Sequence, residues 1–460
     1  MRRLSFLAGL LAVSLGTLTN AEDDMLPKAD GYLGIWYMNQ PSKDEYKYKY
    51  SGGFATYPQQ HHPIAIYSEA ANKTFFVFGG RPRDKNTLLH MVSYFDHETG
   101  TVPRPTILLD KQTTDAHDNP TLSIDEDGHL WIFSNAHGTS RPSFIHRSKE
   151  PFDIDSFEKV VETNFSYGQP WSIPGQGFLF LHTLSAPGRG LTWATSPDGR
   201  EWTDPQPLAS MEMGHYQVSW RRGNRFGTAF NYHPRPVGLN ARTNLYYVQT
   251  EDAGRTWTTV EGDPVETPLT DPEHPSLVHD YQSEDRLVYL KDLNYDADGH
   301  PVILYLTSGG YESGPKNDPR GYHTARWTGA EWIIRDAPKT DHNYDHGSLS
   351  IEPDGTWRLI APTDPGPQPY GTGGEVVLWT SQDQGKTWDR IKALTPESEW
   401  NHTYVRRPLD AHPDFYAIWA DGDAFAPSGS QLYFTNKDGD KVWRLPETMT
   451  EDSVEPEVAW

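Results

Sequence analysis

The sequence of 460 residues is acidic, with 40 Lys and Arg against 63 Asp and Glu and a formal net charge of -23, and it contains no cysteine. This balance excludes a nucleic-acid partner, because phosphate contacts need clustered Lys and Arg, and the missing cysteines exclude disulfides and thiol chemistry. The length is ample for a large buried core.

The first 21 residues have the pattern of a secretory signal peptide. Arg2 and Arg3 form a basic start, the apolar run LSFLAGLLAVSLG follows, and Thr19-Asn20-Ala21 is a small-x-small cleavage site. The run is too short to span a bilayer, and no later segment is long enough either. We therefore expect an exported protein, periplasmic or secreted, with no membrane partner. Residues 22–460 are predicted to form a single domain.

Short runs of Val, Ile, Phe, Tyr and Trp, bounded by Gly, Asp, Asn and Pro, predict β-strands along this domain. Three of the strands are followed by an Asp box, in which an Asp and a Gly make a tight turn and a Trp packs into a neighbouring layer. The boxes are SPDGREW (196–202), TEDAGRTW (250–257) and SQDQGKTW (381–388). Similar strands without a clean box lie at 87–95, 143–148, 321–329 and 431–436. Together they indicate seven similar units.

Each unit is preceded by a hairpin that starts with His or Tyr in a polar setting. The starts are 49 to 63 residues apart: His62, His117, Tyr167, Tyr216, His279, His342 and His402. Seven four-stranded antiparallel units of this size predict an all-β, seven-bladed β-propeller. The start of every innermost strand then lies on one face, around the central axis.

The hairpins bring further side chains to this face. The Asp127-Gly128 turn makes His117 a neighbour of His137, and the turn at 174–177 brings His182 and Thr183 close to Tyr167. In the same way His233 and Arg235 approach Tyr216, and Asp421 approaches His402. A His pair beside a Tyr suits proton transfer near neutral pH. Tyr has an ordinary pKa of ~10, and a neighbouring cation can stabilise its phenolate.

A single His at the start of a strand is usually a structural hydrogen bonder, and this interpretation applies to each of these rim positions taken alone. His342 and His346 in DHNYDH are four residues apart, yet they lie in a predicted loop and strand, and no HxH or HExxH spacing supports a metal site. A structural metal ion stays open without assignable ligands. We expect no required cofactor.

These residues resemble the exported, BNR-type seven-bladed propellers that include ulvan lyases and rhamnose–glucuronate-cleaving relatives. The resemblance covers nearly the whole mature chain. It rests on the His pair 20 residues apart, the Tyr in SYGQPW, the HYQVS and NYHP segments and the Asp boxes. It implies a polysaccharide lyase with an acidic polysaccharide as its substrate. By this resemblance His117 and Tyr167 handle the protons, His137 assists, and an Arg neutralises a uronate carboxylate.

This chain has His182 and Thr183 where that Arg is expected, at the end of the second strand of blade three. Arg189, Arg235 and Arg242 are candidates to replace it. The predicted substrate-binding residues are His62, His182, Arg189, Tyr216, His233, Arg235, His279, His342, Tyr344 and His402.

Two other functions stay open. A glycoside hydrolase of sialidase or rhamnosidase type needs two carboxylates at a defined separation. The rim candidates for that role are Asp118, Asp280, Asp345 and Asp421. The third function is a non-catalytic carbohydrate-binding propeller, because a fold alone does not prove an activity. For each of the three we expect a monomer.

Overall fold

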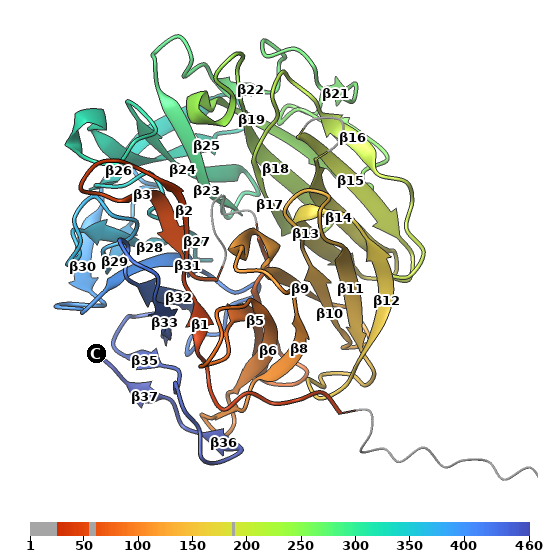
Figure 1. Cartoon of the computed structure of the whole chain (residues 1–460). Helices are drawn as coiled ribbons and strands as arrows, with labels where there is room; N and C mark the ends of the chain where they lie inside the picture. Colours follow the sequence, from red (N-terminus) through yellow and green to blue (C-terminus); the bar gives the residue numbers. More distant parts are fainter. Residues whose placement is uncertain (1–24, 55–60, 186–188) are drawn as a thin grey trace, which may run out of the picture.

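The protein is described by a computed structural model that covers residues 25–54, 61–185 and 189–460; the expected signal peptide lies outside these ranges. Seven antiparallel sheets form a ring around a central axis (Figure 1), so the predicted all-β, seven-bladed propeller is confirmed. Within the described ranges the only helices are three short 3-10 turns: η2 (Ala116–Asp118), η3 (Gly238–Ala241) and η4 (Pro315–Asn317). None of the helices in these ranges is long and apolar enough to cross a membrane.

Four blades have four strands each. Blade two contains β9 (Pro120–Ile124), β10 (Leu130–Ser134), β11 (Ser143–Ser148) and β12 (Phe157–Thr163). Blade three contains β13 (Ser166–Ile173), β14 (Gly177–Leu184), β15 (Gly190–Ser196) and β16 (Gln206–Ala209). Blade five contains β23 (Leu287–Tyr295), β24 (Pro301–Ser308), β25 (Arg320–Trp327) and β26 (Trp332–Thr340). Blade six contains β27 (Ser348–Ile351), β28 (Trp357–Asp364), β29 (Glu375–Ser381) and β30 (Asp389–Ala393).

The other three blades carry extra short strands. Blade one contains β4 (Ala65–Ser68), β5 (Lys73–Gly80), β6 (Leu89–Asp96) and β8 (Thr106–Asp110), with β1 (Gly34–Ile35) and β33 (Gly429–Ser430) on its edge. Blade four contains β17 (Gln217–Arg222), β18 (Arg225–Tyr232), β19 (Thr243–Thr250), β20 (Trp257–Thr258), β21 (Pro264–Val265) and β22 (Leu277–His279). Blade seven contains β31 (Asn401–Arg406), β32 (Ala417–Gly422), β34 (Leu432–Thr435), β35 (Val442–Arg444) and β37 (Glu457–Val458).

The strands inside each blade are packed between two neighbouring blades, and their sequences reflect this. Strand β5 reads KTFFVFGG, and every residue after Lys73 is buried. A strand that is covered on both faces is expected to be a continuous apolar run rather than an alternating one. The aromatic residues of the chain therefore fill the layers between blades.

The Asp boxes are turns that hold such layers together. In all three boxes, the hydroxyl of the first Ser or Thr accepts a hydrogen bond from the backbone N–H of the box glycine, with N···O distances of 2.7 to 2.9 Å. A Cβ on Gly199 would lie 2.4 Å from the ring of Trp131 in the neighbouring blade, so only glycine fits there. The box residue Trp202 packs in the same layer, as the sequence predicts.

In six of the seven blades, the innermost strand begins near the His or Tyr that the sequence predicts as its start. The exception is His279, because it ends β22, which pairs with β19 on the outer part of blade four. Blade five starts instead at β23. The Asp127-Gly128 turn predicts His117 opposite Gly138, but the observed register is shifted by one residue. Leu130 pairs with Ile124, and continuing this register places His117 opposite His137.

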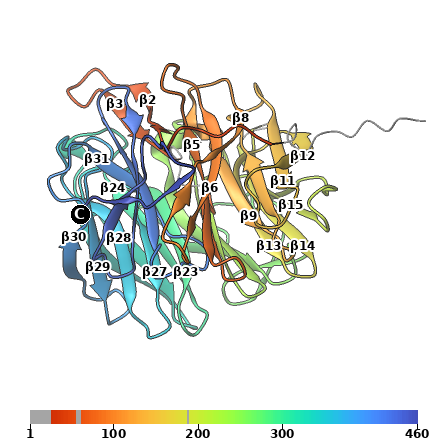
Figure 2. The ribbon, with the colours of Figure 1, turned by 90° about the horizontal axis from the view of Figure 1, so that it is seen from below.

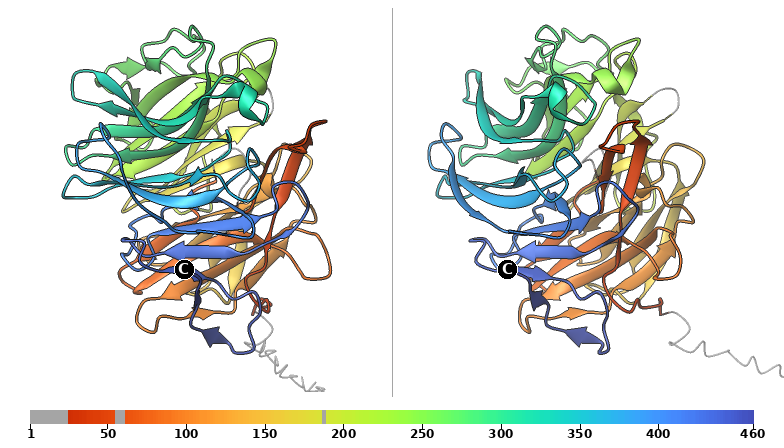
Figure 3. Two further views of the ribbon diagram at one scale, coloured as in Figure 1. Left: turned by 90° about the vertical axis from the view of Figure 1, so that its left-hand side faces the viewer. Right: turned by 60° about the vertical axis from the view of Figure 1, so that its left-hand side comes forward.

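A separate hairpin, β2 (Tyr37–Pro41) and β3 (Tyr48–Gly52), lies across one axial face (Figures 2 and 3). It contacts blade two through His117, blade four through Asn240 and blade six through Tyr344. The face it covers is the one on which the innermost strands begin.

Candidate active site

The centre of the candidate site is Asp115, which lies just before the first strand of blade two. It is the N-cap of the turn η2 and accepts the backbone N–H of His117 at 3.0 Å. The same oxygen, Oδ1, lies 2.5 Å from Nδ1 of the His117 ring. A carboxylate at this position holds the proton on Nδ1 and leaves Nε2 as the basic nitrogen.

The other oxygen of Asp115 holds the second histidine of the hairpin. Oδ2 lies 2.7 Å from Nδ1 of His137, and the two imidazoles stack with centroids 4.1 Å apart and an interplanar angle of 18°. Burial alone would raise the pKa of Asp115, but the hydrogen bonds from both rings outweigh it and hold that pKa well below its usual range. The carboxylate thus stays charged and orients both rings.

Asp118, the last residue of η2, helps to hold His137 in place. It accepts the backbone N–H of His137 at 2.7 Å and Nε of Arg141 at 2.8 Å. Its side chain is fully buried, and Lys111 lies 3.8 Å away as a second cation. Asp118 is therefore a structural ion-pair partner.

Tyr167 stands beside the His pair in an unusual backbone conformation. Its φ is +55°, at a bulge where β13 shifts register between Ser166 and Gln169. Asn135 from blade two supports the bulge by accepting the backbone N–H of Gly168 at 2.7 Å. Strained residues of this kind persist where the surrounding structure fixes them, and they occur often at functional sites.

Tyr167 is linked to a second phenol and a guanidinium. Its ring lies 6.2 Å from that of His117 and 5.8 Å from that of Tyr216, to which its hydroxyl hydrogen-bonds. Arg189 donates to the Tyr216 hydroxyl at 2.7 Å. Burial raises the pKa of Tyr167 well above its ordinary value, while Arg189 acts in the opposite direction. Tyr167 is thus a protonated phenol beside a cation.

We call this set the rim cluster; its members are Asp115, His117, His137, Tyr167, Arg189 and Tyr216. A further cation, Arg242, lies against it. Its guanidinium is 5.2 Å from the ring centroid of Tyr216 and 5.9 Å from that of Tyr344. The cluster therefore combines a polarised imidazole pair with phenols and guanidinium groups.

The β2–β3 hairpin covers the rim cluster. The Tyr50 hydroxyl lies 3.2 Å from Nε2 of His117, and the Tyr37 ring meets the same imidazole edge-on at 5.7 Å. Lys49 hydrogen-bonds Asn240, and burial together with the nearby Arg242 lowers the pKa of Lys49 to about 6.

Three other predicted residues lie close to the cluster or the hairpin. His233 packs against Tyr216 with centroids 4.7 Å apart, and Tyr344 stacks on Tyr50 at 4.7 Å. His342 lies 3.1 Å from the Ser313 hydroxyl beside the hairpin.

The remaining predicted residues do not join the cluster. His62 stacks on Trp220 of blade four, and His182 stacks on Phe180 of the same strand, β14. His279 bonds Glu284 on the outer part of blade four, and Arg235 is exposed on a loop. His402 accepts from the Trp419 indole at 3.1 Å in blade seven.

Several residues of the site were missed by sequence reasoning. Asp115 stood in the spacing Asp-x-His, which was a usable signal, since a carboxylate two residues before a His can cap the turn and reach Nδ1. Tyr37 and Tyr50 gave no signal, because the β2–β3 hairpin meets the cluster across the fold. Arg141 gave no signal either, because its contact with Asp118 depends on the conformations of two loops of blade two.

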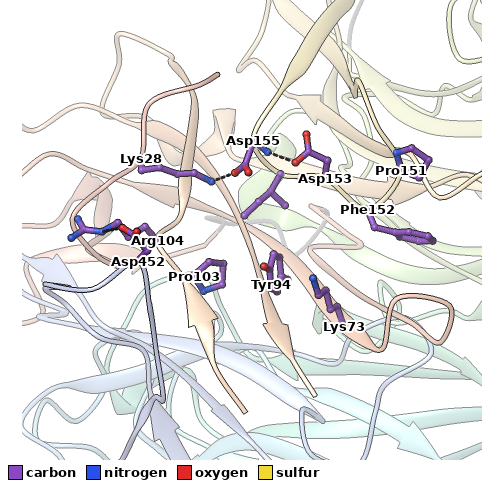
Figure 4. Close-up of a pocket in the computed structure, with 11 residues that line it drawn as sticks. Lys28, Lys73, Tyr94, Pro103, Arg104, Pro151, Phe152, Asp153, Asp155 and Asp452 are labelled. Atoms are coloured by element: carbon purple, nitrogen blue, oxygen red, sulfur yellow. Dashed lines mark hydrogen bonds and ion pairs between the residues drawn. The ribbon is translucent and has the colours of Figure 1, made fainter. Parts of the chain in front are cut away.

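A hollow of about 430 Å³ lies elsewhere, at the outer contact of blades one and two (Figure 4). Lys28 and Asp155 form an ion pair in it, and Lys73 lies 4.1 Å from the centroid of the Tyr94 ring. No histidine lines this hollow. It lacks a base or acid that is positioned as in the rim cluster.

A model of the BNR repeat-containing family matches residues 76–340, which run from blade one through blade five. The chain belongs to this family.

Known proteins of similar sequence carry the name ulvan lyase. The PL25 ulvan lyase of Pseudoalteromonas sp. (strain PLSV) is 21% identical over 366 residues, covering 71% of this chain and 72% of its own length. The ulvan lyase of Nonlabens ulvanivorans is 22% identical over 431 residues, covering 83% of this chain and 88% of its own.

Solved structures share the fold. A PL25 ulvan lyase superposes with a TM-score of 0.69 at 18% identity, covering 89% of this chain and 96% of that one. A structure of the PL25 ulvan lyase bound to -[GlcA(1-4)Rha3S]- gives a TM-score of 0.68 at 18% identity, with the same coverage.

Proposed function

We propose that this protein is an exported polysaccharide lyase that cleaves a uronate-containing polysaccharide of the ulvan type, built from rhamnose and glucuronate, by β-elimination. The observation that carries the proposal is the rim cluster, in which one carboxylate polarises two imidazoles beside a protonated phenol and a guanidinium. The relatives named ulvan lyase support the same substrate class.

β-Elimination needs three groups. A base removes the proton on C5 of the uronate, a cation or hydrogen-bond donor stabilises the charge that develops on the carboxylate, and an acid protonates the leaving oxygen. The C5–H bond and the C4–O bond break, and a C4=C5 double bond forms. The electron pair of C5–H becomes the new double bond, and the pair of C4–O leaves with the oxygen.

His117 is the base in this proposal. Asp115 fixes its Nδ1–H, so Nε2 carries the free lone pair. Burial lowers the pKa of His117 below its ordinary value, although Asp115 opposes this, so the ring is neutral at physiological pH. The imidazolium that forms is then stabilised by the Asp115 carboxylate.

Tyr167 is the acid. Burial keeps its hydroxyl protonated, and the neighbouring Arg189 stabilises the phenolate that is left after the proton is given to the leaving oxygen. Its ring lies within 6.2 Å of the base, which is a suitable span for two groups acting on adjacent carbons of one sugar.

Arg189 neutralises the uronate carboxylate, and His137 assists. Arg189 is only six residues after Thr183, the end of the strand where such an Arg is expected, and it reaches the cluster through Tyr216. Arg242 is fully buried and lies over three Tyr rings, so it acts as a fixed positive charge behind them. His137 is the most accessible member of the His pair, with 37% of its side chain exposed.

Substrate binding requires the β2–β3 hairpin to move. His117 and Tyr167 are only 3% and 2% exposed, and the Tyr50 hydroxyl occupies Nε2 of His117. The sugar must displace Tyr50 to place its C5 proton there.

The carboxylates predicted for a hydrolase are poorly placed for such a role. Asp118 is paired with Arg141, and Asp345 is fully buried with a pKa raised to about 8 by burial. Asp421 is buried in blade seven, and Asp280 is exposed on an outer loop.

The chemistry in this proposal needs no metal. One ligand atom from each of Asp115, His117 and His137 lies within 4.8 Å of the others, so these three residues could hold a cation. However, both Nδ1 atoms are used by the carboxylate, and the base needs a free Nε2. We expect full activity after chelation under conditions where the fold is stable, and we expect a monomer in solution.

The test is to mix the purified protein with ulvan and follow ultraviolet absorbance and reducing ends together. A steady rise in absorbance, from a double bond conjugated to the carboxylate, supports elimination. Reducing ends without that rise would mean hydrolysis. Binding without either signal, on ulvan and on a panel of other uronate polysaccharides, would mean a carbohydrate-binding propeller.

A further inference from the structure

The ring is closed where blade seven meets blade one. On one side of this seam β33 pairs with β1, and the C-terminal strand β36 (Ser453–Val454) pairs with β7 (Val102–Pro103). The chain contains no cysteine, so no disulfide links these blades. Ring closure therefore depends on contacts along the seam.

On the axial face opposite the rim cluster, two imidazoles meet across the seam. His97 follows β6 of blade one, and His412 lies in the loop between β31 and β32 of blade seven. Their ring centroids are 3.9 Å apart. One ligand atom from each of His97, His412 and Asp414 lies within 4.8 Å of the others.

Both imidazoles are held on rigid parts of the fold. The backbone N–H of His97 bonds the Asn72 carbonyl at 3.1 Å. The loop of His412 is fixed by Phe415, which is fully buried and stacks on Phe434 with centroids 4.3 Å apart. Leu409, in the same loop, forms a parallel bridge with Ile66 of blade one. The ligand atoms are thus brought together by the packed seam.

Each imidazole has one nitrogen that can carry the lone pair a metal ion needs. Nε2 of His97 lies 2.8 Å from the Thr74 hydroxyl, whereas its Nδ1 is buried and has no hydrogen-bond partner among the described residues. Nδ1 of His412 accepts the backbone N–H of Asp414 at 3.1 Å, so it is the nitrogen with the lone pair, and it lies 3.8 Å from Oδ2 of Asp414. A ligating His commonly donates its other N–H to an oxygen, as His97 can do to Thr74. A buried nitrogen without a partner is costly unless something binds it.

We propose that His97, His412 and Asp414 form a Zn²⁺ site that fastens blade seven to blade one. Two imidazoles and a carboxylate are ligands that Zn²⁺ prefers, and water completes four-coordinate geometry because Asp414 lies at the solvent. The side chains of His412 and Asp414 are 25% and 66% exposed, so the ion has an entry path.

Residues 97 and 412 lie far apart in the sequence. A bound cation links residues 97 and 412 and thereby constrains a very long loop, which stabilises the closed ring.

The experiment uses the full mature chain after treatment with a chelator. Zn²⁺ is titrated in by calorimetry, thermal unfolding is recorded with and without Zn²⁺, and Co²⁺ is used as a visible-absorption probe of tetrahedral geometry. We expect Zn²⁺ to raise the unfolding temperature of the wild type and Co²⁺ to give a tetrahedral spectrum. Both signals are expected to be lost in His412→Ala. Asp414→Asn, a change at an exposed side chain, is expected to weaken Zn²⁺ binding by more than about 10-fold.

Two matched controls separate this site from other His-carboxylate groups. His300→Ala alters a turn in which Arg326 already occupies Asp296 at 2.7 Å, and His117→Gln alters the rim cluster. Both variants are expected to keep the stabilisation by Zn²⁺. The proposal is overturned if the wild type binds no Zn²⁺, or if binding is unchanged in both His412→Ala and Asp414→Asn. If His412→Ala does not fold, Asp414→Asn alone decides.

Discussion

Blade two and blade seven each bring a His and an Asp to the rim, but the Asp comes from a different place in each: Asp115 precedes the first strand of blade two, and Asp421 lies near the end of the second strand of blade seven. In blade two, Asp115 faces Nδ1 of both imidazoles. In blade seven, His402 pairs with Asp421 in the strand register, but the Asp421 carboxylate bonds the Tyr433 hydroxyl and the Gln431 amide instead.

The pKa values of Asp115, Asp421 and His402 differ because their hydrogen-bond partners differ. The two imidazoles hold the pKa of Asp115 well below its usual range, whereas burial raises the pKa of Asp421 to about 6. Burial lowers the pKa of His402 to about 3, and no carboxylate compensates. At these two rim positions, a carboxylate fixes the tautomer of His117, whereas His402 has no carboxylate partner and is buried in blade seven.

The largest expected effect is on Asp115. Asp115→Asn replaces one acceptor oxygen by an N–H donor, so one imidazole loses its partner and the tautomer of the pair is no longer fixed. We expect kcat for elimination to fall by about 10³- to 10⁴-fold, as when the orienting carboxylate of a catalytic His is removed. Initial rates on ulvan measure this. A loss below about tenfold would mean that Asp115 does not orient the base.

Tyr167→Phe removes the proposed acid and keeps the ring. We expect kcat to fall by about 10²- to 10⁴-fold, the usual range for a general acid, with little change in KM. Tyr433→Phe in blade seven is the matched control and should leave kcat unchanged. Equal effects of the two substitutions would contradict the assignment of Tyr167.

Arg189→Lys keeps the charge but loses the planar fork that reaches Tyr216. We expect kcat/KM to fall by about 10-fold, less than the loss for a complete removal of a charge-stabilising donor. Arg235→Lys, on an exposed loop, serves as the control and should have no effect. The reverse order of effects would show that Arg235 neutralises the carboxylate.

The smallest expected effect is on stability and concerns Asp421 of blade seven. The folded-state pKa of Asp421 is raised, so its charge destabilises the fold at pH values above that pKa, and this penalty disappears as the pH falls. Asp421→Asn should therefore stabilise the protein at neutral pH by at most about 3 kcal/mol and have little effect below pH 4.

The folded-state pKa of Asp115 is depressed, so its charge contributes stability that is present at neutral pH and lost in acid. Asp115→Asn should therefore destabilise the protein at neutral pH. Denaturant unfolding at the two pH values measures both changes. The same sign for Asp115→Asn and Asp421→Asn at neutral pH would contradict the assigned environments.

The sequence predicted the seven blades and the contact between His117 and His137, because both depend on local patterns. Repeated strands and Asp boxes report the blades, and a tight hairpin brings its two ends together. The start of blade five was misplaced at His279, because blade four carries extra outer strands that lengthen it without changing the strand pattern.

The rest of the site depends on tertiary contacts that no local pattern encodes. Tyr50 meets His117 only after the β2–β3 hairpin folds over the axis, 67 residues away in sequence. His402 looked equivalent to His117 by spacing, and only its partners, Trp419 and Tyr433, distinguish it.

The most direct test is the rate of elimination by two matched variants, His117→Gln and His402→Gln, measured on ulvan by ultraviolet absorbance beside the wild type. The account predicts that His117→Gln loses nearly all activity, whereas His402→Gln keeps the wild-type rate and is only less stable. Wild-type activity in His117→Gln, or an equal loss in both folded variants, would contradict it.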